Sequence, residues 1–304
     1  MFKHILVPLD GSRLAEAVFP RLIPLAKSLH ADITLIHIIE KAPPTEIHGD
    51  RHLTKTKEAD EYLRITAKTF IPPEIEVNTH VYETKVNDVA WSIVEHSSEL
   101  KPDLIFISTH GRTGLRDFMV GSIAQQVIGI GELPVLLIRP QEDFIHEEKP
   151  FGKILIGLDG NPEHEVGLNL GSELAKMIHA RLHLLTVIKT LTTLGGNEAA
   201  TGMLLPSTTK LMLDMAEETA FEYLEARADL LQKEGLAVSY DVKRGEPTTK
   251  IVQEAKEANA DLVVLGTHGK VGLNAFWAGS VAPKIPSLTS IPLLFVPFIK
   301  TEIR

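Results

Sequence analysis

Short apolar runs alternate with longer amphipathic stretches along the whole chain. The runs are four to eight residues long and rich in Ile, Val and Leu. Runs of this kind are typical of strands that are buried on both faces. We therefore predict ten strands, at residues 5–9, 33–39, 75–82, 104–107, 135–138, 154–158, 182–188, 237–242, 262–265 and 293–296.

The segments between these runs have helical patterns. We predict helices at residues 13–29, 56–69, 88–100, 122–129, 163–178, 211–234, 248–259 and about 280–287. Pro20 and Pro24 should kink or break the first helix, and Pro286 should shorten the last, because proline lacks the N–H that a helix needs. Alternating strands and helices predict βαβ units, and hence an α/β fold with a parallel sheet covered on both faces.

Two long connections, Lys41–Lys55 and Lys189–Lys210, follow the second predicted strand of each half. The second contains Gly195 and Gly196 beside several threonines. We predict that both are loops. Because the carboxyl ends of parallel strands face the ligand crevice in open α/β sheets, both loops are candidate lids.

The chain carries one glycine motif twice. Ser108-Thr-His-Gly111 is followed nine residues later by Gly121-Ser122, and Gly266-Thr-His-Gly269 is followed nine residues later by Gly279-Ser280. The two copies are 158 residues apart, and the first strands of the two halves are 149 residues apart. This period predicts tandem domains. We assign residues 1–142 to the first domain, 143–150 to a polar linker and 151–304 to the second.

Composition limits the functional classes. At 304 residues and 44% hydrophobic content, two domains can each bury a core. The net charge of −9 disfavours nucleic-acid binding, and no apolar run is long enough to cross a membrane. Without cysteine the chain has no disulfide, no catalytic thiolate and no Cys-ligated zinc. The amino terminus has no signal-peptide pattern, so we expect a cytoplasmic protein.

The second glycine motif predicts a phosphate site. Gly266 and Gly269 follow a predicted strand, where glycine lets the backbone turn sharply and approach a ligand. Gly279 and Ser280 open a predicted helix, whose free N–H groups attract an anion. Ser280 is a candidate N-cap whose hydroxyl could instead bind a phosphate oxygen. The alternative is that these glycines only form turns.

Asp10 and Asp159 end the first predicted strand of each half. A carboxylate at the carboxyl edge of a parallel sheet can accept hydrogen bonds from a ribose or an adenine amino group, or help to hold a metal through water. The alternative is an Asx turn, which Asp-Gly-Ser favours.

Other signals are weaker. Histidines at 110 and 268 within the glycine motifs are more often hydrogen-bonding groups than catalysts. His48 and His52 have a spacing that could bind a metal, with Glu46 and Asp50 nearby, but a solvated loop is the favoured interpretation. The chain has no Gly-Lys-Ser/Thr phosphate loop, no zinc-protease motif and no nucleophile elbow. We therefore assign no catalytic residue and no metal ligand, and expect at most weak ATP hydrolysis.

These motifs resemble the universal stress proteins, with two copies of the UspA-type domain. The family's ATP-binding pattern, Gly-x2-Gly-x9-Gly-Ser/Thr, matches the second half in full. The resemblance implies two tandem Rossmann-like (adenine nucleotide alpha hydrolase-like) domains, each an open five-stranded parallel sheet, and ATP, with or without Mg²⁺, as ligand. It implies that the nucleotide contacts Asp159, Val187, Gly245, Gly266, His268, Gly269, Gly279, Ser280 and Val281.

The first half departs from this pattern. Ser108 replaces Gly266, and Asn87 replaces Gly245. We expect Ser108 to narrow the adenine or ribose pocket, whereas Asn87 tolerates the positive φ of a turn. The phosphate end of the pattern is kept. The weaker candidate site of the first half therefore comprises Asp10, Ile38, Gly111, Arg112, Gly121 and Ser122.

The resulting functional hypothesis is an ATP-binding regulatory module of the stress response. One alternative is a scaffold of the same fold that binds no nucleotide. Another, from fold analogy only, is an enzyme that transfers adenylyl groups. The last strands, at 135–138 and 293–296, are apolar edges that seek partners. The resemblance implies that the two halves pair through them, and a homodimer of the whole chain is a further possibility.

Overall fold

The computed structural model of this chain describes residues 1–41, 46–47, 50–84, 88–109, 122–140, 148–267 and 281–298. The chain forms two compact units. The first contains residues 1–151 together with 267–304, and the second contains residues 152–266. The last strand of the second sequence repeat thus belongs to the first unit, and the domain boundaries at 142 and 151 stay a prediction.

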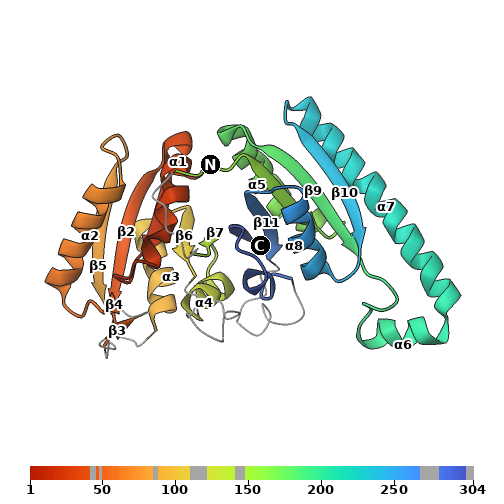
Figure 1. The fold of residues 1–304 in the computed structure, drawn as a ribbon, viewed down its shortest axis with the longest axis horizontal. Helices are drawn as coiled ribbons and strands as arrows, with labels where there is room; N and C mark the ends of the chain where they lie inside the picture. The colour runs from red at the N-terminus through yellow and green to blue at the C-terminus, as the bar shows by residue number, and fades with distance from the viewer. Residues whose placement is uncertain are drawn as a thin grey trace, which may run out of the picture. The chain divides into compact units, whose positions relative to one another are not determined.

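Six strands form the main sheet of the first unit (Figure 1). They are β1 (His4–Pro8), β2 (Asp32–Ile39), β5 (Val77–Glu83), β6 (Leu104–Ser108), β7 (Val135–Ile138) and β12 (Leu293–Pro297). Five of them are parallel, in the order β7-β6-β1-β2-β5. Strand β12 joins antiparallel to β7, with Leu293 opposite Leu137. The centre of the sheet is apolar, and all five residues of β6 are buried.

Helices cover both faces of this sheet because right-handed crossovers place α1 and α2 on one face and α3 and α4 on the other. The helices are η1 (Ala15–Val18), α1 (Phe19–Leu29), α2 (Thr56–Phe70), α3 (Val89–Leu100) and α4 (Ser122–Ile130). The unit also contains the short 3-10 turn η3 (Ile285–Ser287) and a hairpin of β3 (Glu46–Ile47) and β4 (Asp50–Arg51). The rings of Phe19 and Phe70 stack at 4.4 Å between α1 and α2. The first predicted helix is divided into η1 and α1, with helical dihedral angles at their junction, and Pro20 lies in the first turn of α1. The prediction was wrong for Pro24, which lies inside α1 without ending it.

Four parallel strands form the sheet of the second unit, in the order β10-β9-β8-β11. They are β8 (Lys153–Leu158), β9 (Arg181–Ile188), β10 (Val238–Arg244) and β11 (Leu262–Thr267). The connecting elements are η2 (Pro162–His164), α5 (Val166–Ile178), α6 (Gly196–Leu204), α7 (Pro206–Lys233) and α8 (Pro247–Glu257). Helices α5 and α7 cover one face and α8 covers the other (Figure 1). The predicted α/β fold with parallel strands is confirmed.

One predicted loop and one predicted helix differ from the structure. Residues 196–204 and the first turn of α7 are helical, although Lys189–Lys210 was predicted to be a loop. The segment after Gly196 is rich in Ala, Glu, Met and Leu, which favour helix, and Pro206 suits the first turn of a helix. In contrast, the predicted helix at 280–287 is reduced over its described residues to turns and η3, because Pro283 and Pro286 cannot continue a helix.

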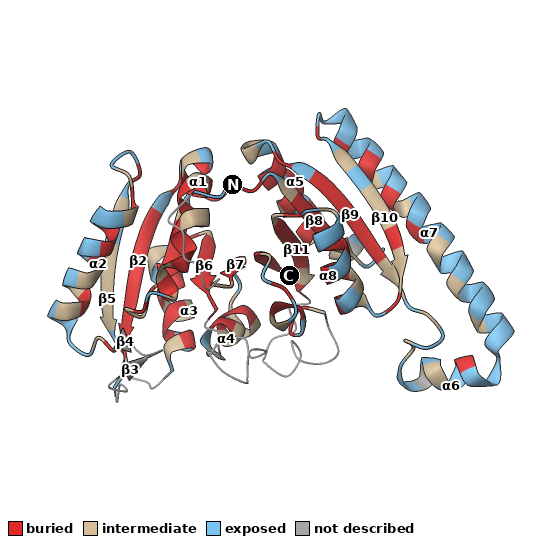
Figure 2. Cartoon of the chain, viewed as in Figure 1, coloured by how far each residue is buried: buried red, intermediate tan, exposed pale blue. Residues whose placement is uncertain are grey.

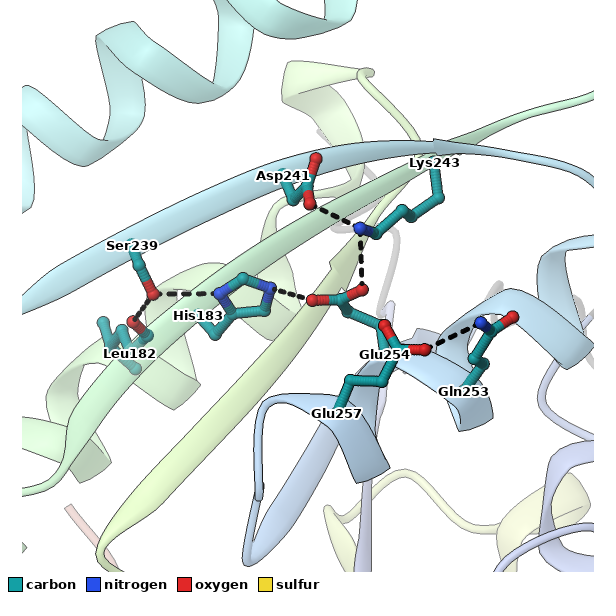
Figure 3. A network of polar contacts seen from close by, with 8 residues as sticks. All are labelled: Leu182, His183, Ser239, Asp241, Lys243, Gln253, Glu254 and Glu257. Carbon is teal, nitrogen blue, oxygen red and sulfur yellow. Dashed lines mark hydrogen bonds and ion pairs between the residues drawn. The ribbon is translucent and has the colours of Figure 1, made fainter.

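A polar network lies between α8 and the strands β9 and β10 (Figure 3). The Nε2 atom of His183 lies 3.1 Å from Oε1 of Glu254, and the Nζ atom of Lys243 lies 3.1 Å from Oε2 of the same carboxylate. Lys243 also contacts Asp241 at 2.6 Å, and His183 Nδ1 lies 2.9 Å from the hydroxyl of Ser239. The His183 and Glu254 side chains are 9% exposed. Glu254 is therefore a buried carboxylate that is paired with a cation.

This network predicts a dependence of stability on pH. Burial lowers the pKa of His183, although Glu254 opposes the shift. The unfolded chain, with a histidine pKa of about 6.5, therefore binds the proton more readily, and the free energy of unfolding should fall as the pH drops below about 6.5. Burial lowers the pKa of His52 and His80 as well, which adds to the same trend.

We expect His183→Asn to reduce this pH dependence, because asparagine can keep the contact with Ser239 and does not titrate. Urea unfolding at about pH 7.5 and about pH 5.5 measures it. The matched control is His30→Asn, since His30 is exposed and its left-handed backbone (φ 50°) tolerates asparagine. An unchanged pH dependence in His183→Asn would contradict the expectation.

Candidate functional site

The strand order of each unit reverses once. In the second unit the chain adds β9 and β10 on one side of β8 and then returns to place β11 on the other side. In the first unit the same reversal separates β1 from β6. Ligands of open α/β sheets bind outside the carboxyl ends of the strands at such a reversal. Asp159 and Gly266 lie at this edge of the second unit, and Asp10 and Ser108 lie at that of the first.

Asp159 is half-exposed and has two short contacts in its own unit. Its Oδ1 atom accepts a hydrogen bond from the backbone N–H of Asn161 at 2.9 Å, which is the Asx turn considered from the sequence. Its Oδ2 atom lies 2.6 Å from Nδ1 of His164. Gly160 between them has a φ of 80°, a conformation that favours glycine. A ligand that contacts this carboxylate must therefore share it with His164.

Gly266 lies against the start of α5. A Cβ atom at Gly266 would lie 3.4 Å from the carbonyl oxygen of His164 and from Cγ2 of Val166. A Cβ atom at Gly167 would lie 3.1 Å from the backbone nitrogen of Gly266. Two glycines thus allow β11 and the first turn of α5 to approach closely. Packing alone explains part of the glycine motif, and the same contact brings the amino end of α5 to the strand-order reversal.

Glu165 joins this edge to α7. Its Oε1 atom accepts hydrogen bonds from the hydroxyl of Tyr223 at 2.6 Å and from Nε of Arg227 at 2.7 Å. Burial and the neighbouring carboxylate raise the pKa of Tyr223, so the phenol keeps its proton and donates a hydrogen bond to Glu165. In the first unit the hydroxyl of Tyr62 donates to Glu16 at 3.1 Å. Because Glu165 directly precedes α5, this contact fixes the start of that helix.

This pair of contacts was not predicted from the sequence. The signal lies in the repeat, because Glu165 is 149 residues after Glu16 and Tyr223 is 161 residues after Tyr62. The first offset equals that of the first strands. A comparison of polar residues between the two copies would have singled out Glu165 and Tyr223, but not their contact.

The edge of the first unit differs in one residue of the motif. The hydroxyl of Ser108 donates to the carbonyl of Leu14 at 2.8 Å, and Ser108 is buried. Asp10 accepts hydrogen bonds from both the N–H and the hydroxyl of Ser12, at 2.9 and 2.7 Å. The extra side chain of Ser108 is therefore bonded to the chain just before η1, and narrowing of a pocket stays a prediction.

The remaining candidates are only partly described. Val187 is half-buried in β9, and Ile38 is buried in β2. Gly245 follows β10 with a φ of 147°, and its N–H donates to the carbonyl of Ile188 at 2.9 Å. Val281 is half-buried, and Ser122 begins α4. Asn87, His110, Gly111, Arg112, Gly121, His268, Gly269, Gly279 and Ser280 lie outside the described residues.

The metal alternative at the first long connection is only partly described as well, because His48 lies outside the described residues. His52 is buried, with Nε2 3.9 Å from Oε1 of Glu40. Over the part of the chain that the structure describes, no three His, Asp or Glu side chains are placed to hold a metal ion.

Parallel strands covered on both faces, with an order reversal between β8 and β11, define an open doubly wound α/β protein. The profile of the universal stress protein family matches residues 1–139 and 150–297. The chain therefore belongs to the universal stress protein family, and the two matches confirm the tandem repeat.

Individual relatives agree with this assignment. A universal stress protein of Mycolicibacterium smegmatis is 23% identical over 304 residues, which cover 96% of each chain. Universal stress protein MJ0531 of Methanocaldococcus jannaschii is 30% identical over 146 residues, 46% of this chain and 83% of the relative. The crystal structure of a universal stress protein from Archaeoglobus fulgidus has a TM-score of 0.71 at 16% identity, covering 97% of this chain and 98% of that one. This last likeness shows the Rossmann-like fold.

Among the helices that the structure describes, none combines the length and the apolar character needed to cross a membrane.

The contacts of Glu165 yield a prediction. Tyr223→Phe removes one hydrogen bond to a carboxylate and should lower the free energy of unfolding by about 2 kcal/mol. Tyr62→Phe removes the longer bond to Glu16 and should cost about 1 kcal/mol. Urea unfolding followed by circular dichroism measures both. An unchanged free energy of unfolding in Tyr223→Phe would show that the hydrogen bond between Tyr223 and Glu165 does not stabilise the fold.

Proposed function

We propose that the second repeat binds an adenine nucleotide, with ATP as the candidate ligand, and that the protein acts as a nucleotide-dependent regulatory module. The observation that carries the proposal is the position of Asp159, directly after β8, and of Gly266, near the end of β11, because these two strands flank the order reversal in the second unit. The complete glycine pattern of that repeat, Gly266, Gly269, Gly279 and Ser280, supports it from the sequence.

The proposed contacts follow from the chemistry of each residue. Asp159 would accept hydrogen bonds from the ribose or the adenine amino group, and Val187 would lie beside the adenine ring. Gly245 and Gly266 leave the backbone bare for close approach. The N–H groups of the chain at His268, Gly269, Gly279, Ser280 and Val281 would hold the phosphates, with or without Mg²⁺. When bound, the nucleotide would supply a polyanion that favours one conformation of the surrounding segments.

We assign no general base, so any hydrolysis should be slow, and binding rather than turnover would carry the signal. A second, weaker site would comprise Asp10, Ile38, Gly111, Arg112, Gly121 and Ser122 of the first repeat. The hydrogen bond of Ser108 to Leu14 distinguishes this repeat from the second one.

We further propose that the two repeats associate through their last strands. The antiparallel pairing of β7 with β12, which come from different repeats, supports this association. Such pairing removes apolar edges that would otherwise recruit other chains. A homodimer of the whole chain would need a different surface.

Calorimetric titration of ATP with magnesium tests the proposed site. We expect heat of binding and a raised melting temperature at about 1 mM ATP, because a ligand that binds only the native state stabilises it. Gly279→Glu should lower the affinity by about tenfold or more, since a carboxylate there would repel phosphate. The matched control, Gly121→Glu in the first repeat, should have the smaller effect. Neither heat nor a melting shift for the unaltered protein would end the proposal.

The difference between the repeats offers a second test. Gly266→Ser copies the first repeat into the second, and its Cβ would meet neighbours at 3.4 Å, a distance that small shifts accommodate. We expect it to weaken nucleotide binding by about tenfold while the melting temperature without ligand changes little. Ser108→Gly is the reciprocal variant and should strengthen binding at the first repeat. Equal affinities for all three proteins would place position 266 outside the ligand site.

One observation favours a second candidate, a scaffold that binds no nucleotide. Both oxygens of Asp159 have contacts within the chain, to Asn161 and His164. Under this alternative, Gly279→Glu would leave the biological function unchanged, whereas nucleotide-dependent regulation would be lost in the same variant.

A further inference from the structure

Large apolar side chains are exposed along α6 and the first half of α7. Six of them form what we call the α6–α7 apolar surface: Met203, Leu204, Leu205, Leu211, Met212 and Met215. Their exposed fractions range from 55% for Leu205 to 84% for Met203. Half of the six methionines of the chain are here. Isolated exposed apolar residues are common, whereas several of them on two helices that pack together are typical of an interaction site.

The surface is exposed because only the second half of α7 packs against the sheet. The buried residues of this helix are Ala220, Leu224, Ala228 and Leu231, one on each successive turn. The corresponding helix of the first repeat, α2, has 15 residues, whereas α7 has 28. Figure 2 shows α6 and the first half of α7 as mainly exposed. The longer α7 is therefore an addition that the core of the unit does not need.

The added segment is held in place by specific contacts. The Nη2 atom of Arg244, at the end of β10, lies 2.6 Å from Oδ1 of Asp214 and 2.6 Å from Oε2 of Glu217. Helix α6 packs back at Gly202, where a Cβ atom would lie 3.3 Å from Leu194 and 3.7 Å from Thr209. A surface that is already ordered loses little entropy when a partner binds.

Two acidic residues follow the apolar surface on one face of α7. Leu211, Met215, Glu218 and Glu222 follow one another at spacings of four, three and four residues, so they share one face of α7. Glu218 and Glu222 are exposed. This face therefore changes from apolar to acidic along the helix, and the one basic residue of α7 beside the apolar surface is the exposed Lys210, directly before Leu211.

We propose that the α6–α7 apolar surface binds a basic amphipathic helix of another protein. The partner's aliphatic residues would pack on Leu211, Met212 and Met215, and its Lys or Arg residues would lie beside Glu218 and Glu222. Flexible methionine side chains suit partners of varied shape, and an apolar face placed on an apolar surface is a common mode of helix recognition. A second copy of the chain would bring the same acidic residues, and an anionic membrane would be repelled by them.

The probe for this proposal is a fluorescein-labelled peptide of about 18 residues made of Leu and Lys, with Leu on one helical face. Fluorescence anisotropy with the full-length protein measures its binding. Two control peptides have the same composition in scrambled order, or Glu in place of Lys. We expect the Leu/Lys peptide to bind about tenfold more tightly than either control.

Paired variants separate the apolar and the acidic contributions. Leu211→Ser with Met215→Ser should weaken binding about tenfold, because both side chains are exposed and their removal leaves the core intact. Glu218→Lys with Glu222→Lys should reverse the preference between the Lys and Glu peptides. The matched control is Ile65→Ser with Trp91→Ser, which removes exposed apolar residues of α2 and α3. Circular dichroism confirms that each variant is folded.

Three results would overturn the proposal. Equal binding of the three peptides, or equal binding by all variants, would show that this surface does not recognise a basic helix. Sedimentation equilibrium supplies the third result. A dimer that is lost in Leu211→Ser with Met215→Ser would assign the surface to a second copy of the chain.

Discussion

Strands that are apolar on both faces need helices on both faces, and this requirement organises the rest of the molecule. A right-handed crossover places each helix on the same face as long as the chain adds strands in one direction. The opposite face is covered only when the chain returns to the other side of its first strand, as β11 does beside β8. That return creates the reversal at which Asp159 and Gly266 lie. The position of the candidate site is thus a consequence of covering the sheet.

The two copies of the domain show which details of this arrangement can change. The contact between a tyrosine and a glutamate is present in both, as Tyr62 with Glu16 and Tyr223 with Glu165. The contact at the reversal is not, because Ser108 bonds to a backbone carbonyl where Gly266 packs closely on α5. The tyrosine contact near the start of a helix is common to both copies, whereas the residue at the strand-order reversal, Ser108 or Gly266, differs between them.

The second copy also has features that its own core does not require. The network of His183, Glu254 and Lys243 places charged groups between α8 and the sheet. The first half of α7 does not pack on the sheet. In the first feature a carboxylate is buried, and in the second methionine side chains are exposed, so each kind of group lies where it is less common. Such exceptions are more informative about specialised roles than the buried aliphatic residues, which any fold of this class needs.

The sequence by itself determined the strands, the tandem repeat and the family, because continuous apolar runs and repeated glycines are local signals. It also placed Asp159 and Gly266 at strand ends. It failed at Lys189–Lys210, which was predicted to be a loop although α6 begins at Gly196, the second of two adjacent glycines. Only the tertiary structure decided that Glu165 meets Tyr223, that Glu254 meets His183, and that Leu211 and Met215 stay exposed. The two contacts join elements far apart in the chain, and exposure depends on which part of α7 packs on the sheet, so no local pattern encodes them.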